Sequence, residues 1–338
     1  MDEAARLADV AAAAGVSVAT ASRALSGRGS VAPATRDRVV EAATRLEFHP
    51  SAAGRSLRLR ETRMIGFVVP DIASGFYANA LKGAQHRLQA AGYQVALMDT
   101  NEDPERERAA LLALAADRVD GFILASSGGD ASPIRSIERR FGLPVVMFDN
   151  VVDGVGAGRV TLANEDGLHL LVGHLAEAHG HRRVGYVGGI VSETSGAERL
   201  SGFELAMLRQ HLPVDPRWVR PGEWTEEAGQ AETAALLALD EPPTAIVYPC
   251  ADLALGGLTE LRARGASVPA DVAIVCFDDF DAAPLLDPPL TVLARRDRQV
   301  GDLAASMVLR AIEHSDAGPM DVRISVELLI RRSCGCTP

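Results

Sequence analysis

The sequence predicts an α/β core of two doubly wound, parallel-sheet lobes, preceded by an all-α headpiece that contains a helix-turn-helix. Three observations lead to this prediction. From Met64 onward, short β-branched runs alternate with amphipathic helical stretches, which is typical of parallel sheets covered by helices on both faces. The alternation forms two series that divide near residue 160. Ahead of both series, residues 7–27 place one glycine between two alanine-rich runs.

The stretch LADVAAAAGVSVATASRALSG (7–27) predicts a helix, a tight turn and a second helix. Gly15 would cost roughly 1 kcal/mol relative to alanine in a helix interior, so its presence favours a turn. Ser17 can cap the second helix, because its hydroxyl accepts a hydrogen bond from the free amides of a first turn. We expect Val10 and Ala21 to pack in a small apolar seam. This is helix-turn-helix geometry, in which the second helix enters the DNA major groove.

Two further segments follow before the core. Residues 32–48 have Pro33 at a helix start and apolar residues at helical spacing, which predicts a third helix. Residues 49–62 are proline-led and rich in Ser, Gly and Arg. They have little to bury and are expected to form a linker.

The charge is distributed unevenly along the 338 residues. The net charge of the whole chain is −11. Residues 1–60 hold nine Arg and six acidic residues, so their net charge is +3, and the remaining residues carry −14. A basic head on an acidic body suits phosphate binding at one end. The sequence has no apolar run of about 18 residues and no basic start followed by an apolar segment. We therefore expect a cytoplasmic protein without a membrane partner.

The ends of the predicted strands indicate where a ligand would bind. Ligands of open parallel sheets bind beyond the carboxyl ends of the strands. These ends read PDIASGFY, DTNEDPER, FDN, GGIVSET, YPCAD and FDDFD, and are rich in acids, amides and aromatic residues. The sequence therefore predicts a ligand site in a cleft between the two lobes.

Several ordered segments are similar to one known family. They read DVAAAAGVSVATASRAL, TRDRVVEAATRL, HPSAAGRSLR, IGFVVPDI, GHRRVGYVGG, ERLSGF, VPADVAIVCFDD and IRRSCG. With these segments the sequence resembles the LacI family of bacterial repressors over essentially its whole length. The resemblance implies a headpiece that docks on a palindromic double-stranded operator as a homodimer or higher oligomer. It also implies a hinge helix in the minor groove and a periplasmic-binding-protein-like core that senses a small molecule.

The resemblance implies the following domains. Residues 1–48 would be the headpiece, 49–62 the hinge, and 63–338 the effector-binding and dimerisation core. The chain of the core would cross between its lobes three times. The first lobe would take about residues 63–161 and 292–320, and the second about 162–291 and 321–338.

By the same resemblance, the DNA contacts fall on the second helix, the third helix and the hinge. Arg23 can contact guanine in a bidentate manner, whereas Val18 and Ala19, where many relatives carry long polar groups, can offer a thymine methyl only apolar contact. Leu57 would be a wedge between base steps. The expected DNA-binding residues are Ser17, Val18, Ala19, Thr20, Ser22, Arg23, Arg36, Arg55, Leu57 and Arg58.

Matching the family's strand ends places seven side chains around the cleft: Phe76, Tyr77, Asp149, Arg199, Trp224, Asp278 and Arg295. A carboxylate accepts hydrogen bonds from vicinal hydroxyls, a guanidinium donates to ring oxygens, and aromatic faces suit the C–H side of a sugar. Ala163, Ala251 and Arg295 stand where relatives commonly have Asp, Asn and Gln. This exchange favours a phosphorylated or acidic sugar over a neutral one. The alternative is that the aromatics only pack in the cleft wall and the charges pair with one another.

Other chemistry has little support in the sequence. No two of the histidines 169, 174, 179 and 181 stand at i, i+3 or i, i+4, the spacing that a metal site completed by a carboxylate would want. The CGC stretch (334–336) is an isolated pair of cysteines near the end. We therefore expect no metal, no cofactor and no catalytic residue. A solute-binding receptor and a sugar-processing enzyme remain alternatives because they could share the architecture of the core.

Overall fold

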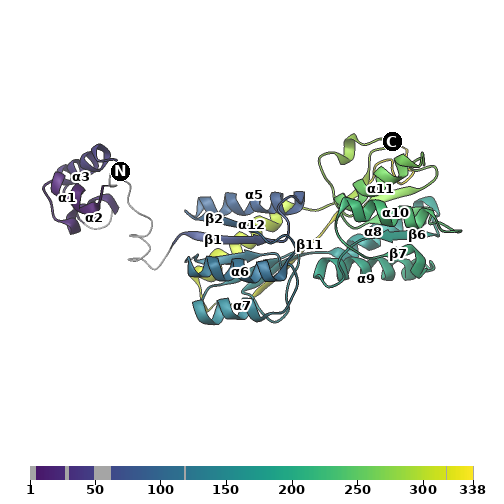
Figure 1. The fold of residues 1–338 in the computed structure, drawn as a ribbon, viewed down its shortest axis with the longest axis horizontal. Coiled ribbons are helices and arrows are strands. Elements are labelled where there is room, and N and C mark those ends of the chain that lie inside the picture. The colour runs from purple at the N-terminus through teal and green to yellow at the C-terminus, as the bar shows by residue number, and fades with distance from the viewer. Residues whose placement is uncertain (1–4, 27–29, 49–61, 118, 317, 338) are drawn as a thin grey trace. The chain divides into compact units, whose positions relative to one another are not determined.

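The computed structural model describes residues 5–26, 30–48, 62–117, 119–316 and 318–337 (Figure 1). The chain divides into two units, Met1–Thr62 and Arg63–Pro338, which we describe separately. Most of the predicted hinge, including Arg55, Leu57 and Arg58, lies outside the described residues.

The first unit contains the headpiece, with helices α1 (Leu7–Ala13), α2 (Val18–Ser26) and α3 (Pro33–Arg45). The predicted turn is confirmed, because Gly15 has a φ of 63° between α1 and α2. The predicted cap is confirmed as well, because the Thr20 amide donates to Ser17 Oγ at 3.1 Å. Val10 and Ala21 are fully buried in a core shared by all three helices.

The first lobe of the core has a six-stranded, all-parallel sheet of order β11-β5-β4-β3-β1-β2. Helices α5 and α12 cover one face, and α6 and α7 cover the other (Figure 1). Its strands are β1 (Met64–Val69), β2 (Gln94–Asp99), β3 (Gly121–Leu124), β4 (Val145–Phe148), β5 (Gly158–Leu162) and β11 (Met320–Ile324). Its helices are α5 (Gly75–Ala90), α6 (Pro104–Ala116), α7 (Ser132–Ser136), which continues as the π-helix η1 (Ile137–Phe141), and α12 (Asp297–Glu313).

The second lobe has a six-stranded sheet of order β12-β10-β9-β8-β6-β7, in which only β12 is antiparallel to its neighbour. Its strands are β6 (Val184–Val187), β7 (Val219–Arg220), β8 (Ala245–Tyr248), β9 (Ala273–Cys276), β10 (Thr291–Ala294) and β12 (Glu327–Leu329). Its helices are α8 (Asn164–His179), α9 (Thr194–Arg209), α10 (Glu226–Leu237) and α11 (Ala251–Ala263), with short 3₁₀ turns at η2 (Pro216–Trp218) and η3 (Ala283–Leu285). Helices α8 and α9 pack together, as do α10 and α11.

The chain passes between the lobes after β5, after β10 and after β11. Two of these crossings differ from the predicted boundaries at 292 and 320. Strand β10 pairs with β9 in the second lobe, and β11 pairs with β5 in the first, so both crossings come a few residues later. Among the described helices, none is long and apolar enough to cross a membrane.

Candidate ligand cleft and nucleic-acid interface

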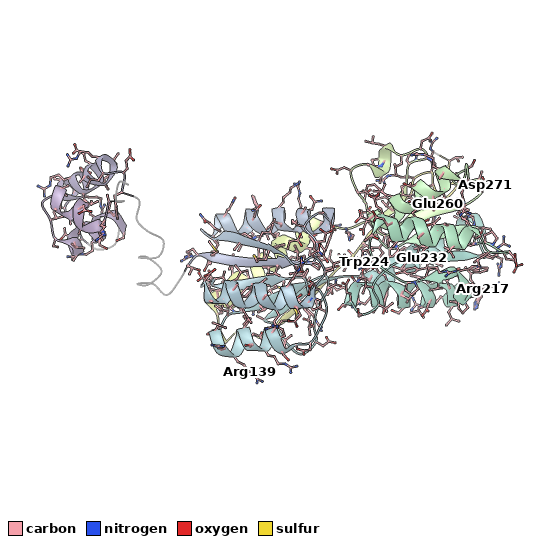
Figure 2. The ribbon with its side chains drawn as sticks, viewed as in Figure 1. Arg139, Arg217, Trp224, Glu232, Glu260 and Asp271 are labelled. Atoms are coloured by element: carbon pink, nitrogen blue, oxygen red, sulfur yellow. The ribbon has the colours of Figure 1, made fainter. Side chains whose placement is uncertain are left out.

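A cavity of about 670 Å³ is lined by residues of both lobes. All seven side chains proposed from the sequence lie on its wall. Each comes from a strand end or an adjacent helix, as expected for open parallel sheets. Trp224, labelled in Figure 2, lies on the second lobe where it meets the first. The seven are Phe76, Tyr77, Asp149, Arg199, Trp224, Asp278 and Arg295.

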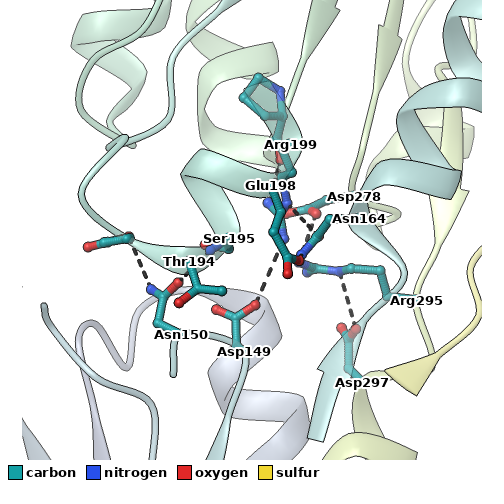
Figure 3. A network of polar contacts seen from close by, with 12 residues as sticks. Asp149, Asn150, Asn164, Thr194, Ser195, Glu198, Arg199, Asp278, Arg295 and Asp297 are labelled. Carbon is teal, nitrogen blue, oxygen red and sulfur yellow. Dashed lines mark hydrogen bonds and ion pairs between the residues drawn. The ribbon is translucent and has the colours of Figure 1, made fainter. Parts of the chain in front are cut away.

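On the first lobe, Asp149 directly follows β4 and has a φ of 57°, a left-handed conformation that is uncommon for a residue with a side chain. Its Oδ2 accepts a hydrogen bond of 2.9 Å from the Tyr77 hydroxyl. Burial raises the pKa of Tyr77 well above its usual value, and the charge of Asp149 raises it further, so Tyr77 remains a donor. Asp149 Oδ1 lies 3.9 Å from Arg199 Nη2 of the second lobe (Figure 3).

Arg199 on α9 is only 3% exposed, and contacts within the second lobe fix its guanidinium. Its Nε donates to Asn164 Oδ1 at 3.0 Å, and its Nη1 donates to the Pro249 carbonyl at 2.7 Å. The guanidinium lies 4.2 Å from the centre of the Phe277 ring. Two of its three nitrogens are thus engaged, so Arg199 has fewer donors for a ligand than the sequence suggested.

Arg295, which follows β10, connects carboxylates of both lobes. Its Nη1 lies 2.8 Å from Asp278 Oδ1 of the second lobe, and its Nε lies 3.4 Å from Asp297 Oδ1 at the start of α12 (Figure 3). Burial raises the pKa of Asp297 to about 6 despite the opposing charge of Arg295. The guanidinium also lies 4.3 Å from the centre of the Phe76 ring. The alternative of charges pairing with one another is therefore partly realised here.

Glu193 is a residue of the cleft that sequence analysis did not single out. Its Oε2 accepts hydrogen bonds from Trp224 Nε1 at 2.9 Å and from Asn150 Nδ2 at 3.0 Å. Asn150 belongs to the first lobe, so this carboxyl links the two lobes. Burial raises the pKa of Glu193 to about 7. The only sequence signal for Glu193 and Asn150 was their place in the strand-end stretches GGIVSET and FDN.

The wall of the cleft carries a large excess of acidic side chains. Eleven acidic residues line it against two arginines, and both arginines already contact carboxylates. This excess disfavours a negatively charged ligand, whereas the sequence favoured a phosphorylated or acidic sugar. Ala251 lies on the wall, whereas Ala163 is not among the residues that line it.

In the headpiece, the start of α2 presents its side chains to solvent. Ser17, Ala19 and Arg23 are exposed, and Val18 is 49% exposed. In a helix-turn-helix, the first residues of the second helix contact base edges. The predicted residues Thr20 and Ser22 are instead half-buried.

Two arginines of the headpiece differ in their surroundings. Arg23 Nε donates to the carbonyl of Ala19 on its own helix at 3.2 Å. Arg36 on α3 is half-buried, and its Nε is buried without a hydrogen-bond partner among the described residues. The Arg36 side chain as a whole is only half-buried, and a guanidinium in such a position is suited to a phosphate oxygen.

The expectation of no metal-binding group stays a prediction, but the fold adds an observation that bears on it. The sequence presents His174 and His179 as surface histidines and Cys334 and Cys336 as an isolated pair. The fold brings the side-chain ligand atoms of all four within 4.8 Å of one another. The reason is tertiary, because the C-terminal segment lies against the end of α8.

Comparison with known proteins identifies the family. The model of the bacterial regulatory proteins of the lacI family matches residues 6–51, and the model of periplasmic binding proteins and the sugar binding domain of the LacI family matches residues 62–332. The chain belongs to the LacI family. Among its LacI-family relatives, the repressor PurR of Haemophilus influenzae is 32% identical over 331 residues, 96% of this chain and 97% of that one.

Two solved LacI-family structures are similar over nearly the whole chain. The lac repressor dimer bound to operator and the anti-inducer ONPF has a TM-score of 0.87 at 26% identity, covering 98% of this chain and 99% of that one. The regulator CelR in complex with cellobiose has a TM-score of 0.74 at 29% identity, covering 97% and 99%. The chain is a LacI-family DNA-binding transcriptional repressor, and the named relatives are regulators rather than enzymes.

Proposed function

We propose that this repressor binds a palindromic operator in the cytoplasm as a homodimer or higher oligomer, and that a neutral sugar or sugar derivative in the cleft controls this binding. Residues 1–48 would read the operator, 49–62 would act as the hinge, and 63–338 would sense the effector and dimerise. The similarity to the lac repressor dimer on its operator supports the first part. The composition of the cleft supports the second.

The DNA contacts follow from the exposed start of α2. Val18 and Ala19 would make apolar contacts with base edges, such as a thymine methyl, while Arg23 would donate to guanine. Arg36, which is half-buried on α3, would bind a phosphate through its guanidinium. Ser17, Thr20 and Ser22 would contact phosphates of the DNA backbone. The DNA contacts of Arg55, Leu57 and Arg58 are proposed from the family resemblance alone.

The effector proposal depends most on one observation. Asp149 Oδ1 on the first lobe and Asp278 Oδ1 on the second are both buried and accept no hydrogen bond from the described residues. Their arginine neighbours lie at 3.9 and 2.8 Å without hydrogen-bond geometry. Buried carboxylate oxygens without donors are costly, and hydroxyl groups of a ligand would satisfy both. A polyol that donates to one carboxylate in each lobe would also hold the lobes in one relative position.

The chemistry of the cleft favours a neutral ligand. A phosphate or carboxylate would meet eleven acidic side chains and two arginines that are already engaged. A neutral sugar avoids this repulsion, offers several hydroxyl donors, and can place its C–H face on Trp224 or Phe76. Cellobiose, the ligand in the similar CelR complex, is such a molecule.

A thermal-shift screen tests this proposal. Neutral sugars, sugar phosphates, uronic acids and purines are each added to the full chain. A ligand at 100 times its Kd stabilises the folded state by about 2.7 kcal/mol, which raises the melting temperature of the core by several degrees. We expect hits among neutral sugars and none among sugar phosphates. A response to purines alone, or to phosphorylated sugars alone, would contradict the proposed effector class.

A further inference from the structure

Four side chains form a compact group where the end of α8 meets the C-terminal segment. His174 Nε2 lies 3.3 Å from Cys334 Sγ and 3.7 Å from Cys336 Sγ, and His179 Nε2 lies 3.3 Å from Cys336 Sγ. The two imidazole rings meet edge to face with their centres 5.0 Å apart. In each ring the same nitrogen, Nε2, points to the sulfur atoms. The group therefore gathers two nitrogen and two sulfur ligand atoms within 4.8 Å of one another.

Three of the six separations within this group are those of a tetrahedral zinc site, and all six are within 4.8 Å. Zinc binds sulfur at about 2.3 Å and imidazole nitrogen at about 2.0–2.1 Å, so a tetrahedral arrangement separates nitrogen from sulfur by about 3.5 Å. The three separations of 3.3, 3.7 and 3.3 Å scatter around this value. A tetrahedral set of two thiolates and two imidazoles selects zinc among the common divalent ions.

The local backbone explains how two cysteines two residues apart reach the same point. Gly335 between them has a φ of 107°, which a residue with a side chain rarely adopts. A Cβ at this position would also lie 3.1 Å from His179 Nδ1, closer than ordinary packing allows. Glycine thus permits both the turn and the close approach of the imidazole. On the other side, His179 ends α8, and the chain turns away at Gly180 with a φ of 70°.

A supporting hydrogen bond is already in place at the buried sulfur. The Thr291 hydroxyl donates to Cys334 Sγ at 3.1 Å and accepts from the Arg331 amide at 2.9 Å. A donor to sulfur stabilises a thiolate, and such outer contacts are typical of metal sites. Cys336 lines a surface depression of about 600 Å³, which provides a path for an ion from solvent.

We propose that His174, His179, Cys334 and Cys336 bind one zinc ion that fastens the C-terminal segment of the chain to the end of α8. On binding, each thiol gives its proton to solvent, so that Zn²⁺ replaces two protons and the imidazoles remain neutral. No electron is transferred. The fastened segment carries Arg331, which pairs with Asp279 of the cleft wall at 2.9 Å. The ion therefore stabilises the second lobe and the position of one wall of the cleft.

Two other states of the same group are possible outcomes of a test. Without metal, each thiol can donate a hydrogen bond to an imidazole nitrogen. Under oxidation, Cys334 and Cys336 can form a disulfide. If the group serves only as a set of hydrogen bonds or as a redox pair, the reduced chain does not respond to zinc.

The test uses the full chain, reduced and stripped of metal with a chelator, and titrated with ZnCl₂ or CoCl₂. We expect one zinc per chain, a rise of several degrees in the melting temperature of the core, and the cobalt spectrum of a tetrahedral site with thiolate charge-transfer bands. Cys336→Ser and His179→Gln should each weaken zinc binding by more than the roughly 10–100-fold that loss of a supporting hydrogen bond causes. Both residues are only partly buried, so these variants are expected to fold.

His169→Gln is the matched control, because it makes the same change on α8 at a histidine outside the group. It should bind zinc like the wild type. The proposal is wrong if the reduced chain takes up no zinc and shows no thermal response. It is equally wrong if Cys336→Ser and His179→Gln take up zinc as the control does.

Discussion

Buried carboxyl groups dominate the cleft at the scale of single residues. Glu193 shows what burial does to one of them, since two hydrogen bonds from Asn150 and Trp224 do not outweigh its loss of solvent, and its pKa rises to about 7. A carboxyl with a raised pKa in the folded state binds its proton more tightly there than in the unfolded state. Its contribution to stability is therefore greatest at low pH and is lost as the pH rises from about 4.5 to about 7.

Glu193→Gln should remove this pH dependence, because the amide keeps an oxygen for the hydrogen bonds and carries no charge. Between pH 5 and pH 8, the wild type should lose up to about 3 kcal/mol of unfolding free energy through this group. The variant should not show this loss. Denaturant unfolding at the two pH values measures the difference. Glu204→Gln, at an exposed position of α9, is the control. Parallel pH profiles for Glu193→Gln and wild type would show that burial does not raise the pKa of Glu193.

Arg23 and Arg36 are expected to act on DNA in different ways. Arg23→Ala should lose about 1–3 kcal/mol of preference for the operator while non-specific binding stays nearly intact, because base readout is lost. Arg36→Ala should weaken binding to all DNA sequences alike, because one phosphate contact is lost. It should also reduce the slope of log affinity against log salt concentration by about one. Titrations of operator and random duplex at several salt concentrations separate the two. If Arg23→Ala discriminates as well as wild type, α2 lies in a different register on the bases.

Individual cleft residues could be predicted from the sequence only in part. Strand ends and the family resemblance placed Tyr77, Asp149 and Arg295 on the wall. That charges could pair with one another was left open as an alternative, but the sequence did not show which ones: Arg295 pairs with Asp278, which follows the neighbouring strand, and with Asp297 at the start of α12. Tertiary packing also hid the cysteine–histidine group, because its histidines and its cysteines are more than 150 positions apart in the sequence.

At the scale of secondary-structure elements, periodicity and turn chemistry predicted most of the fold. The turn at Gly15 and the cap at Ser17 are local features, and the structure has both. The sheet to which a short strand belongs is decided by its neighbours and not by its own pattern. For this reason β10 and β11 lie on the other side of the predicted crossings at 292 and 320.

Gly15→Ala tests the turn between α1 and α2. A residue with a Cβ at a φ of 63° costs roughly 1–2 kcal/mol, although no neighbouring atom would obstruct it. For a small domain, each 1 kcal/mol lowers the melting temperature by about 4–8 °C, so the headpiece should melt several degrees earlier in calorimetry of the full chain. Gly142→Ala, at the same kind of position in the first lobe with a φ of 67°, should shift the transition of the core instead. An unchanged headpiece transition in Gly15→Ala would exclude a left-handed turn there.

At the scale of the whole molecule, control of DNA binding requires a ligand that interacts differently with two arrangements of the core. The cleft offers the means, since Asp149 and Asp278 lie on different lobes and each has a buried oxygen that accepts no hydrogen bond from the described residues. A ligand that bridges them favours one arrangement of the lobes. By linkage, the operator and the ligand must then change each other's affinity by the same factor.

Operator affinity with and without effector tests this account most directly. Fluorescence anisotropy of the full chain on DNA from upstream of its own gene is measured with and without the neutral sugar found in the thermal screen. We expect the sugar to change the operator affinity of wild type by at least about tenfold, a coupling of roughly 1.4 kcal/mol. Asp278→Asn should abolish this change, and Asp240→Asn, on an exposed loop outside the cleft, should retain it. An operator affinity that no sugar alters, or a sugar response that survives in Asp278→Asn, would contradict control through this cleft.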